Sequence, residues 1–275
     1  MTGPWTIWLA SYPKSGNTWL RAMLTALRNG PQLDVNDLDG GPIASARDHV
    51  ESWIGFASSD LTPGELDRTL DEVRFRKIHD ALLSAPEGAP IVPSDRTKGA
   101  VYVTRDPRDV AVSYAYHTGR THEWAVDELA NPAAFMVGPP GASGAQARMR
   151  LGTWSEHQRE WTRQAPFPVL VVRYEDMSAD PRAELTRVAR FAGVDADQER
   201  VVAAVNAARF DTLRDQEDTT GFHSAPAWDR PFFRRGEAGA WRDELAPELA
   251  AKVERDHAEV MAELGYAPEA SGGGR

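Results

Sequence analysis

The chain lacks two features that would point to common classes of protein: cysteine, and an excess of positive charge. Its 275 residues include no cysteine, which excludes disulfide bonds, metal sites built from thiolates and thiol nucleophiles. The formal net charge is −10, from 41 acidic and 31 basic residues. General nucleic-acid binders carry the opposite charge, so we expect no nucleic-acid partner, although a local basic pocket is compatible with this composition.

A long hydrophobic run is also lacking. The apolar stretch near the N-terminus ends after about five residues, at Tyr12-Pro13-Lys14, which is too short for a signal peptide or a membrane span. We therefore expect a cytoplasmic protein with no membrane partner. The composition, with 41% hydrophobic and 26% charged residues, is typical of a globular protein. Its length suits one domain, predicted over residues 1–268, and the glycine-rich residues 269–275 predict a flexible tail.

The most informative stretch is residues 6–27. An apolar run predicts a buried strand, the polar residues after it predict a loop, and the apolar spacing from Thr18 to Leu27 predicts a helix. A loop with lysine and glycine between a strand and a helix N-terminus can cradle a phosphate. It is not a Walker A loop, because here the lysine precedes the glycine, in Lys14-Ser15-Gly16. An ordinary strand-to-helix turn is the alternative.

Strands and helices alternate along the rest of the chain, which predicts a single α/β domain with a mostly parallel central sheet flanked by helices. The predicted strands are residues 6–10, 75–79, 99–104 and 168–172. Helices are predicted over residues 62–73, from Pro107, and over 151–163, 180–192, 195–208 and 247–264. We expect short helices and loops over residues 31–60, a long loop over 131–147 and a polar, irregular segment over 214–227. The regions expected to shape an acceptor pocket are 31–60, 131–150 and 215–231.

A histidine and a lysine stand at the end of the predicted strand at 75–79. Lys77 and His79 are two positions apart, so their side chains leave the same face of the strand. His79 is therefore a candidate base and Lys77 a candidate contact to an anionic group. A structural or surface histidine is the equally weighted alternative.

Two further segments carry arginines that suit an anion. Arg105 ends a buried strand, Asp106 can cap the helix that follows, and Ser113 lies on that helix. A salt bridge between Arg105 and Asp109 is the structural alternative. Later in the chain, adjacent arginines precede a glycine between aromatic residues, in FFRRGEAGAW at 232–241, where guanidinium and backbone N–H groups could wrap an anion. A solvated basic turn is about as plausible from spacing alone.

Four segments in order, SYPKSGNTW at 11–19, RKIHD at 76–80, YVTRDPRDVAVSY at 102–114 and FFRRGEAGAW at 232–241, resemble the cytosolic-type sulfotransferases. Those enzymes use 3′-phosphoadenosine 5′-phosphosulfate (PAPS). The resemblance spans roughly residues 5–265. The sequence of the first motif most resembles bacterial members that sulfate natural products, such as the glycopeptide-antibiotic sulfotransferases. It implies PAPS as co-substrate, a small-molecule hydroxyl acceptor (phenol or alcohol), and no metal. It leaves a homodimer open.

The resemblance also implies a role for each matching residue. The 5′-phosphosulfate group would be bound by Lys14, Ser15, Gly16, Asn17 and Thr18, and the adenine would lie near Trp19, Tyr174 and Phe210. The 3′-phosphate would be bound by Arg105, Ser113, Arg234, Arg235 and Gly236. The catalytic residues would be Lys14, Lys77 and His79, with His79 as the base for the acceptor hydroxyl and the lysines stabilising the transferring group.

Two positions depart from the family pattern. Asp80 follows His79 where many members carry an apolar residue, and Ala208 stands near Phe210 where animal members carry a threonine. Two other kinds of protein remain as alternatives. A P-loop kinase or NTPase would need Mg²⁺ and a lysine after the second glycine. A non-catalytic nucleotide-binding protein of the same fold could dispense with His79.

Overall fold

The computed structural model describes residues 5–38, 43–45, 74–84, 90–136, 149–222 and 230–266. In this part of the chain the centre is a five-stranded sheet in the order β2-β3-β1-β4-β7, and all neighbouring strands are parallel. The strands are β1 (Thr6–Ser11), β2 (Ile43–Ser45), β3 (Arg74–Ile78), β4 (Thr97–Thr104) and β7 (Val169–Arg173). The four predicted strands are confirmed as β1, β3, β4 and β7, and β2 is an addition.

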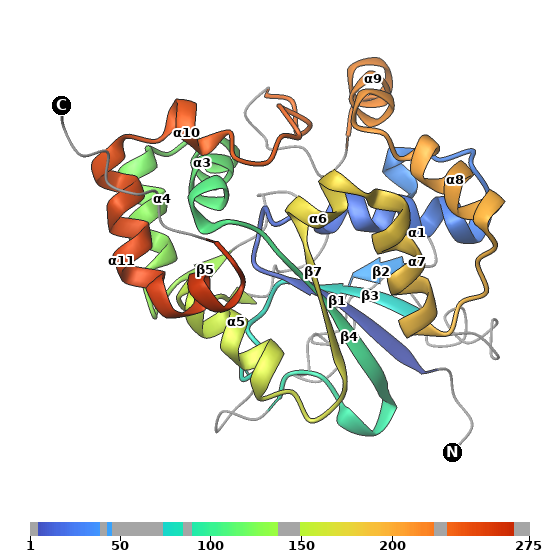
Figure 1. Cartoon of the computed structure of the whole chain (residues 1–275), viewed down its shortest axis with the longest axis horizontal. Coiled ribbons are helices and arrows are strands. Elements are labelled where there is room, and N and C mark those ends of the chain that lie inside the picture. Colours follow the sequence, from blue (N-terminus) through green and yellow to red (C-terminus); the bar gives the residue numbers. More distant parts are fainter. Residues whose placement is uncertain are drawn as a thin grey trace, which may run out of the picture.

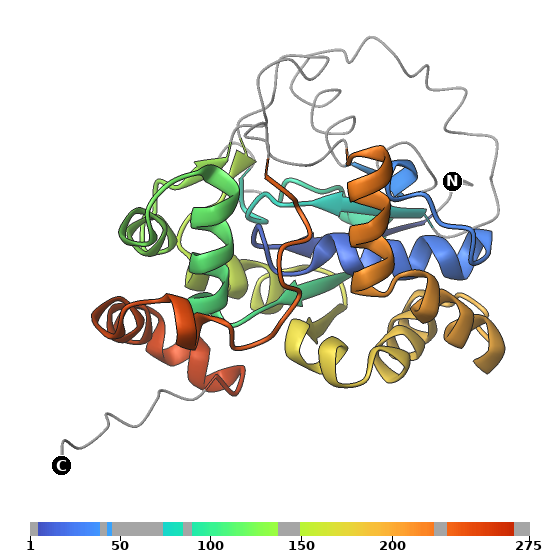
Figure 2. The same cartoon turned by 90° about the horizontal axis from the view of Figure 1, so that it is seen from above.

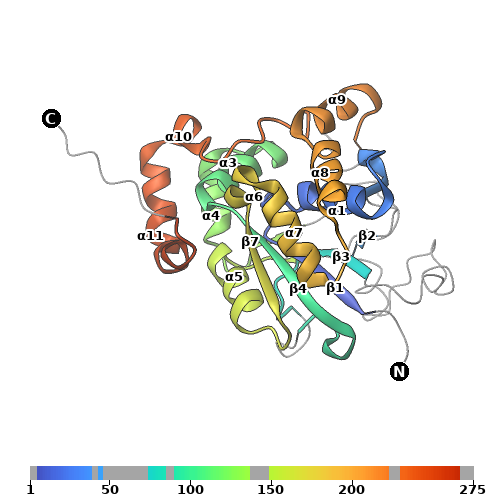
Figure 3. The same cartoon turned by 45° about the vertical axis from the view of Figure 1, so that its right-hand side comes forward.

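The sheet is covered on both faces, as Figures 1 and 3 show. Successive residues of β1 face opposite sides: Ile7 and Leu9 belong to one apolar cluster, Trp8 and Ala10 to another. The first cluster packs against α1 (Asn17–Asn29), α7 (Pro181–Ala192) and α8 (Gln198–Ala207). The second packs against α5 (Trp154–Arg163) through Trp161. Burial on both faces explains why the central strands are nearly continuous apolar runs.

A third apolar cluster joins the helices beside the sheet. It unites α5 with α3 (Pro107–Thr118), α4 (His122–Leu129), α10 (Trp241–Glu244) and α11 (Pro247–Glu263). The remaining described elements are the helices α6 (Tyr174–Ala179) and α9 (Phe210–Thr220), the 3₁₀ turns η1 (Val35–Leu38) and η3 (Ser94–Arg96), and the antiparallel pair β5 (Phe135–Met136) and β6 (Met149–Arg150).

Several helices begin where local capping chemistry favours it. Asp106 and Asp180 accept backbone N–H bonds at the N-caps of α3 and α7, with Pro107 and Pro181 in the first turn, as predicted. The helix predicted from residue 151 begins instead at Trp154, because Thr153 and Glu156 form a capping box. The helix predicted from 195 begins at Gln198, after the N-cap Asp197.

One prediction about secondary structure is wrong. Residues 214–227 were expected to be irregular, but Arg214 to Thr220 belong to helix α9. That helix has few apolar residues, and only Leu213 and Glu217 are buried, so its sequence carries little periodic signal. The predicted helix at 62–73, the tail at 269–275 and residues 137–147 of the predicted loop lie outside the described residues. No described helix is both long and apolar enough to cross a membrane.

Candidate active site

The carboxyl ends of β1, β3 and β4 open onto a cavity of about 410 Å³, here called the central cavity. In parallel α/β sheets this edge is where ligands bind. Of the fifteen predicted site residues, fourteen line it: Lys14, Gly16, Asn17, Thr18, Trp19, Lys77, His79, Arg105, Ser113, Tyr174, Phe210, Arg234, Arg235 and Gly236. The exception is Ser15, which is fully buried and whose hydroxyl has no hydrogen-bond partner among the described residues.

The β1–α1 loop has a backbone shape that its residues make possible. Gly16, at the N-cap of α1, has a φ of 102°, and a Cβ there would lie 2.6 Å from Cδ2 of Tyr174. Glycine is therefore required both by conformation and by the close approach of that ring. Lys14 also has a positive φ, of 67°, which is uncommon for a residue with a side chain. Such strain is found most often at ligand-binding loops.

The side chain of Asn17 has a structural role. Its Nδ2 donates to the backbone carbonyl of Leu9 at 2.8 Å and to Oγ of Ser11 at 3.3 Å. These bonds tie the start of α1 to the end of β1. The side-chain amide is therefore occupied, and the predicted contact of Asn17 with phosphate would be made by its backbone N–H group.

His79 has a defined tautomer. Its Nδ1 lies 2.9 Å from the backbone oxygen of Ser11 and 3.1 Å from that residue's Oγ. A carbonyl oxygen can only accept, so Nδ1 carries a hydrogen and, in the neutral ring, Nε2 is the free base. Burial, together with the charge of Lys77, lowers the pKa of His79 well below its usual value. The imidazole is therefore neutral at pH 7 and suited to accept a proton.

Lys14 lies in a strongly cationic environment. Burial lowers the pKa of its ammonium to about 7, and the charges of Arg105, Lys77 and Arg234 contribute in the same direction. The ammonium lies 3.9 Å from the centroid of the Phe232 ring. An anion bound beside it would reverse this pKa shift.

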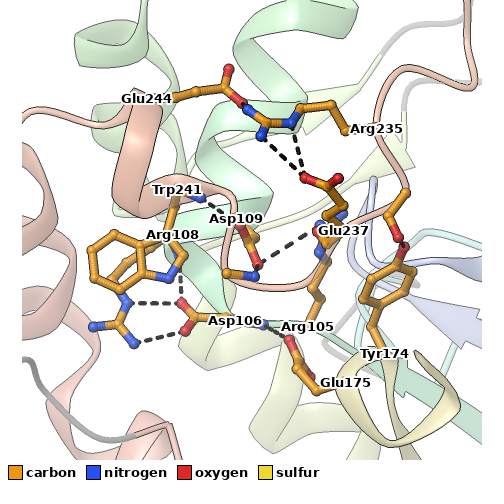
Figure 4. Close-up of polar contacts among 12 residues, drawn as sticks. Arg105, Asp106, Arg108, Asp109, Tyr174, Glu175, Arg235, Glu237, Trp241 and Glu244 are labelled. Carbon is orange, nitrogen blue, oxygen red and sulfur yellow. Dashed lines mark hydrogen bonds and ion pairs between the residues drawn. The ribbon is translucent and has the colours of Figure 1, made fainter. Parts of the chain in front are cut away.

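Residues 232–241, here called the late loop, are anchored near both ends by buried carboxylates. Glu217 of α9 accepts the N–H groups of Phe232 and Phe233 at 2.6 and 2.9 Å. Asp109 of α3 accepts those of Gly239 and Trp241 at 2.7 and 2.9 Å (Figure 4). Figure 2 shows this segment passing between α3 and α9. The loop is thus preformed by charge-assisted hydrogen bonds.

Arg105 is held between the sheet edge and the late loop. Its guanidinium donates to the backbone oxygen of Glu237 at 2.6 Å, lies 3.7 Å from the Asp109 carboxylate, and stacks 4.2 Å above the Tyr174 ring (Figure 4). The salt bridge foreseen as the structural alternative for Arg105 therefore exists, together with its place in the cavity. By contrast, Arg108 turns away, to Asp106 and Glu254.

The paired arginines of the late loop contact carboxylates of α10 and of the loop itself. Arg234 binds Glu244 through two hydrogen bonds of 2.5 and 2.9 Å, and Arg235 contacts Glu244 at 3.0 Å and Glu237 at 3.1 Å. These contacts hold the two guanidinium groups in the lining of the central cavity, where an incoming phosphate would compete with the carboxylates for them.

Aromatic rings form one wall of the cavity. The rings of Trp19 and Tyr174 lie 5.7 Å apart, and Nε1 of Trp19 donates to the backbone oxygen of Ala208 at 2.8 Å. The Tyr174 hydroxyl donates to the oxygen of Gly236 at 2.7 Å. A Cβ on Gly236 would meet Cδ2 of Phe210 at 2.3 Å, so this glycine lets the late loop approach the ring. The wall offers flat apolar surface to a base.

Several residues that support the site were not predicted as part of it, among them Asp109, Ser11, His157 and Glu217. Ser11 follows Ala10, which pairs with Ile78 in parallel register, so the next pair along is Ser11 and His79. The predicted strands could have indicated this contact. His157 of α5 donates from Nε2 to the backbone oxygen of His79 at 3.0 Å, and its Nδ1 accepts from the Tyr102 hydroxyl at 2.7 Å. No sequence signal indicates His157 or Glu217.

The central cavity fits a polyanion. Among its described lining residues five are cationic (Lys14, Lys77, Arg105, Arg234, Arg235) and two are carboxylates (Asp109, Glu237), in a chain whose net charge is −10. In addition, Nε of Arg105, a lining residue, is buried without a partner in the described part of the chain. Within those same residues, no group of three histidine or acidic side chains is placed to hold a metal ion.

Comparisons with known proteins agree on one family. The family model described as "Sulfotransferase domain" matches residues 4–265. The chain is 29% identical to cytosolic sulfotransferase 12 of Arabidopsis thaliana, over 90% of this chain and 74% of that protein. It is 24% identical to sulfotransferase 1A1 of Rattus norvegicus, over 94% and 85% of the two chains.

Solved structures share the fold. Retinol dehydratase, in complex with androsterone and the inactive cofactor PAP, matches with a TM-score of 0.62 and 20% identity, over 93% of this chain and 80% of that one. Mouse sulfotransferase SULT7A1, complexed with PAP, matches with a TM-score of 0.61 and 19% identity, over 95% and 86%.

Proposed function

This chain belongs to the sulfotransferase domain family, and we propose that it transfers a sulfuryl group from PAPS to a hydroxyl of a small-molecule acceptor. The observation that carries the proposal is one cavity that combines five cationic side chains with a neutral histidine whose Nε2 is free to accept a proton. A donor with two separate anionic groups suits the cations, and a hydroxyl that must lose its proton suits the histidine.

In this proposal the donor binds across the carboxyl edge of the sheet. The β1–α1 loop, with Lys14, Ser15, Gly16, Asn17 and Thr18, holds the 5′-phosphosulfate group. The base lies against Trp19, Tyr174 and Phe210, and the 3′-phosphate is bound by Arg105, Ser113, Arg234, Arg235 and Gly236. Guanidinium groups suit a phosphate because each presents several donors in one plane.

The transfer step then uses Lys14, Lys77 and His79. Nε2 of His79 takes the proton of the acceptor hydroxyl as its oxygen forms a bond to sulfur. In line, the bond between sulfur and the 5′-phosphate oxygen breaks, and 3′-phosphoadenosine 5′-phosphate (PAP) keeps the electron pair. The lysines stabilise the charge where it develops, on the leaving oxygen and the transferring group. No metal takes part in this proposal.

The proposal names the acceptor only by its chemical class. We propose a phenol or alcohol, with a natural product as the physiological acceptor, and a cytoplasmic enzyme, as the names of the cytosolic relatives suggest. Residues 39–42, 46–60, 137–148 and 223–229, which fall in the segments expected to shape the acceptor pocket, lie outside the described residues.

The test is a transfer assay with PAPS labelled with ³⁵S in the sulfuryl group, using 4-nitrophenol and a panel of phenols and alcohols as acceptors. The expected result is labelled sulfate ester and stoichiometric PAP without added Mg²⁺, with both lost in Arg105→Ala. Phosphorylated products from ATP and Mg²⁺, with none from PAPS, would overturn the proposal.

A further inference from the structure

We propose that Phe232 is a positioning residue for Lys14: its ring holds the lysine ammonium at the transfer site, and Glu217 fixes the ring by binding the backbone of the late loop. The inference rests on the proposed function only in assigning Lys14 to the transfer step. The inference assigns a role to Phe232, the first aromatic residue of the late loop. It also explains why Glu217 of α9 is buried beside that loop.

The contact itself is a cation lying over an aromatic face. Nζ of Lys14 lies 3.9 Å from the centroid of the Phe232 ring, well within the range of about 6 Å for a favourable cation–π interaction. Among the described residues, this ammonium makes no hydrogen bond or ion pair. The ring is therefore its direct contact partner, in surroundings where Arg105, Lys77 and Arg234 repel the ammonium and the charge of Glu217 attracts it.

The ring is fixed from several sides. The backbone N–H of Phe232 donates to Oε1 of Glu217 at 2.6 Å, and that glutamate is only 8% exposed. The rings of Phe222, Phe233 and His117 meet the Phe232 ring edge-on, with centroids 5.0, 5.1 and 6.1 Å away. The partners thus come from α9 and its C-terminal end, from the late loop and from α3, which leaves a face of the ring for the lysine.

This arrangement matters for the chemistry because a lysine side chain has four rotatable bonds. An ammonium that must be beside the bridging oxygen when charge develops there gains from being held near that place beforehand. The backbone of Lys14 is already in an uncommon conformation, with a φ of 67°, so the loop and the ring constrain the side chain from its two ends.

A direct test of the contact does not depend on any acceptor. The chain has four lysines (Lys14, Lys77, Lys98, Lys252), so protein labelled with ¹³C-lysine gives four εCH₂ signals. We expect the Lys14 signal, assigned by its loss in Lys14→Met, to be shifted upfield by the ring current. Phe232→Leu should remove that shift. Phe167→Leu, the same change in a different apolar cluster, where Phe167 packs beside Trp161, should keep it. A Lys14 signal without an upfield shift in the unaltered protein would overturn the proposal.

A second test asks whether Phe232 acts through Lys14. With ³⁵S-labelled PAPS and 4-nitrophenol, we expect Phe232→Leu to lower kcat about tenfold and Phe232→Tyr to restore it. The control Phe167→Leu should change kcat less than about threefold. In a Lys14→Met background, Phe232→Leu should have no further effect. Equal losses in both backgrounds, or an equal loss in Phe232→Tyr and Phe232→Leu, would show a merely structural role and overturn the proposal.

The two proposals fail differently. If Lys14→Met keeps full transfer, or no acceptor is sulfated, the proposed function or the role of Lys14 in it is wrong, whatever the ring does to the lysine signal. If transfer depends on Lys14 but not on the ring, only the present inference is wrong. Should Phe232→Leu fail to fold, Phe232→Met gives a second non-aromatic variant for both measurements.

Discussion

At the scale of single residues, the proposed transfer depends on two groups whose protonation is set by their surroundings. His79 is neutral because it is buried beside Lys77, and its tautomer is set by the carbonyl of Ser11. Lys14 is held near its point of deprotonation by burial and by neighbouring cations. The proposed transfer step needs both: a neutral histidine that accepts a proton, and a protonated lysine that stabilises negative charge. Binding of an anionic donor would favour the protonated form of Lys14.

His79→Ala removes the proposed base while leaving the cationic groups in place. We expect kcat for an alcohol acceptor to fall by roughly 10²–10⁴, and less for a phenol, whose proton is more acidic. PAP affinity, measured by calorimetry on the same samples, should stay within about threefold, since His79 is not among the donor ligands. Unchanged turnover with the alcohol would remove His79 as the base.

The Lys14 ammonium should titrate unusually low in the free protein. With ¹³C-lysine labelling, the signal that is absent from Lys14→Met should have a midpoint of about 7. Saturating PAP should raise that midpoint, because the phosphates favour the charged form. A midpoint in the free protein near the ordinary lysine value of about 10.4 would contradict the cationic environment described for Lys14.

At the scale of elements, the site is built where helices hold loops against the sheet edge. α3 supplies Asp109 to one end of the late loop and α9 supplies Glu217 to the other. The loop therefore needs little rearrangement to present Arg234, Arg235 and Gly236. Two buried carboxylates beside an anion site are unfavourable for simple electrostatics, so their presence indicates a positioning role.

Asp109→Asn separates these two effects, because they have opposite signs. Loss of a negative charge alone would strengthen binding of an anion. Loss of the charge-assisted bonds to Gly239 and Trp241, and of the pairing with Arg105, should instead weaken PAP binding by roughly tenfold or more. Asp218→Asn, an exposed change of the same charge on α9, should have little effect. Tighter PAP binding by Asp109→Asn would contradict the anchoring role.

Much of the fold and site could be predicted from local sequence. The strands of the sheet core are apolar runs, and α3 and α7 begin at Asp-Pro pairs, so pattern and capping chemistry determine them. The residues of the donor site lie in motifs at the ends of those elements. What could not be predicted depends on contacts between distant segments: Glu217 with Phe232, and His157 with the backbone of His79. Helix α9 could not be predicted because its sequence is polar and only Leu213 and Glu217 are buried, which leaves no apolar periodicity.

At the scale of the whole molecule, an acidic chain concentrates cations in one cavity. The net charge of −10 contrasts with five cationic and two acidic side chains among the described residues that line it. Such a contrast favours a small polyanion that enters the cavity over an extended one that lies on the surface. It also implies that part of the folding free energy is spent on burying charged groups near the site.

The free-energy cost of burying the charged carboxylate of Asp80 should appear as a dependence of stability on pH. Burial raises the pKa of its carboxyl from 3.8 to about 7. The folded state therefore binds the proton more tightly than the unfolded state, and the stability present below about pH 4 is lost as the pH rises toward 7. Asp80→Asn cannot ionise, so its melting temperature should exceed that of the unaltered protein at pH 8. The two should nearly coincide at low pH, and a constant difference across the range would contradict the raised pKa.

The proposed function requires the central cavity to bind a donor with a 3′-phosphate. Calorimetric titration of PAP and of ATP in Mg²⁺-free buffer, on the unaltered protein and on Arg105→Ala, tests it most directly. We expect tight binding of PAP, at least about tenfold weaker binding of ATP, and loss of that difference in Arg105→Ala. Tighter binding of ATP, dependent on added Mg²⁺ and unaffected by Arg105→Ala, would contradict the proposed function.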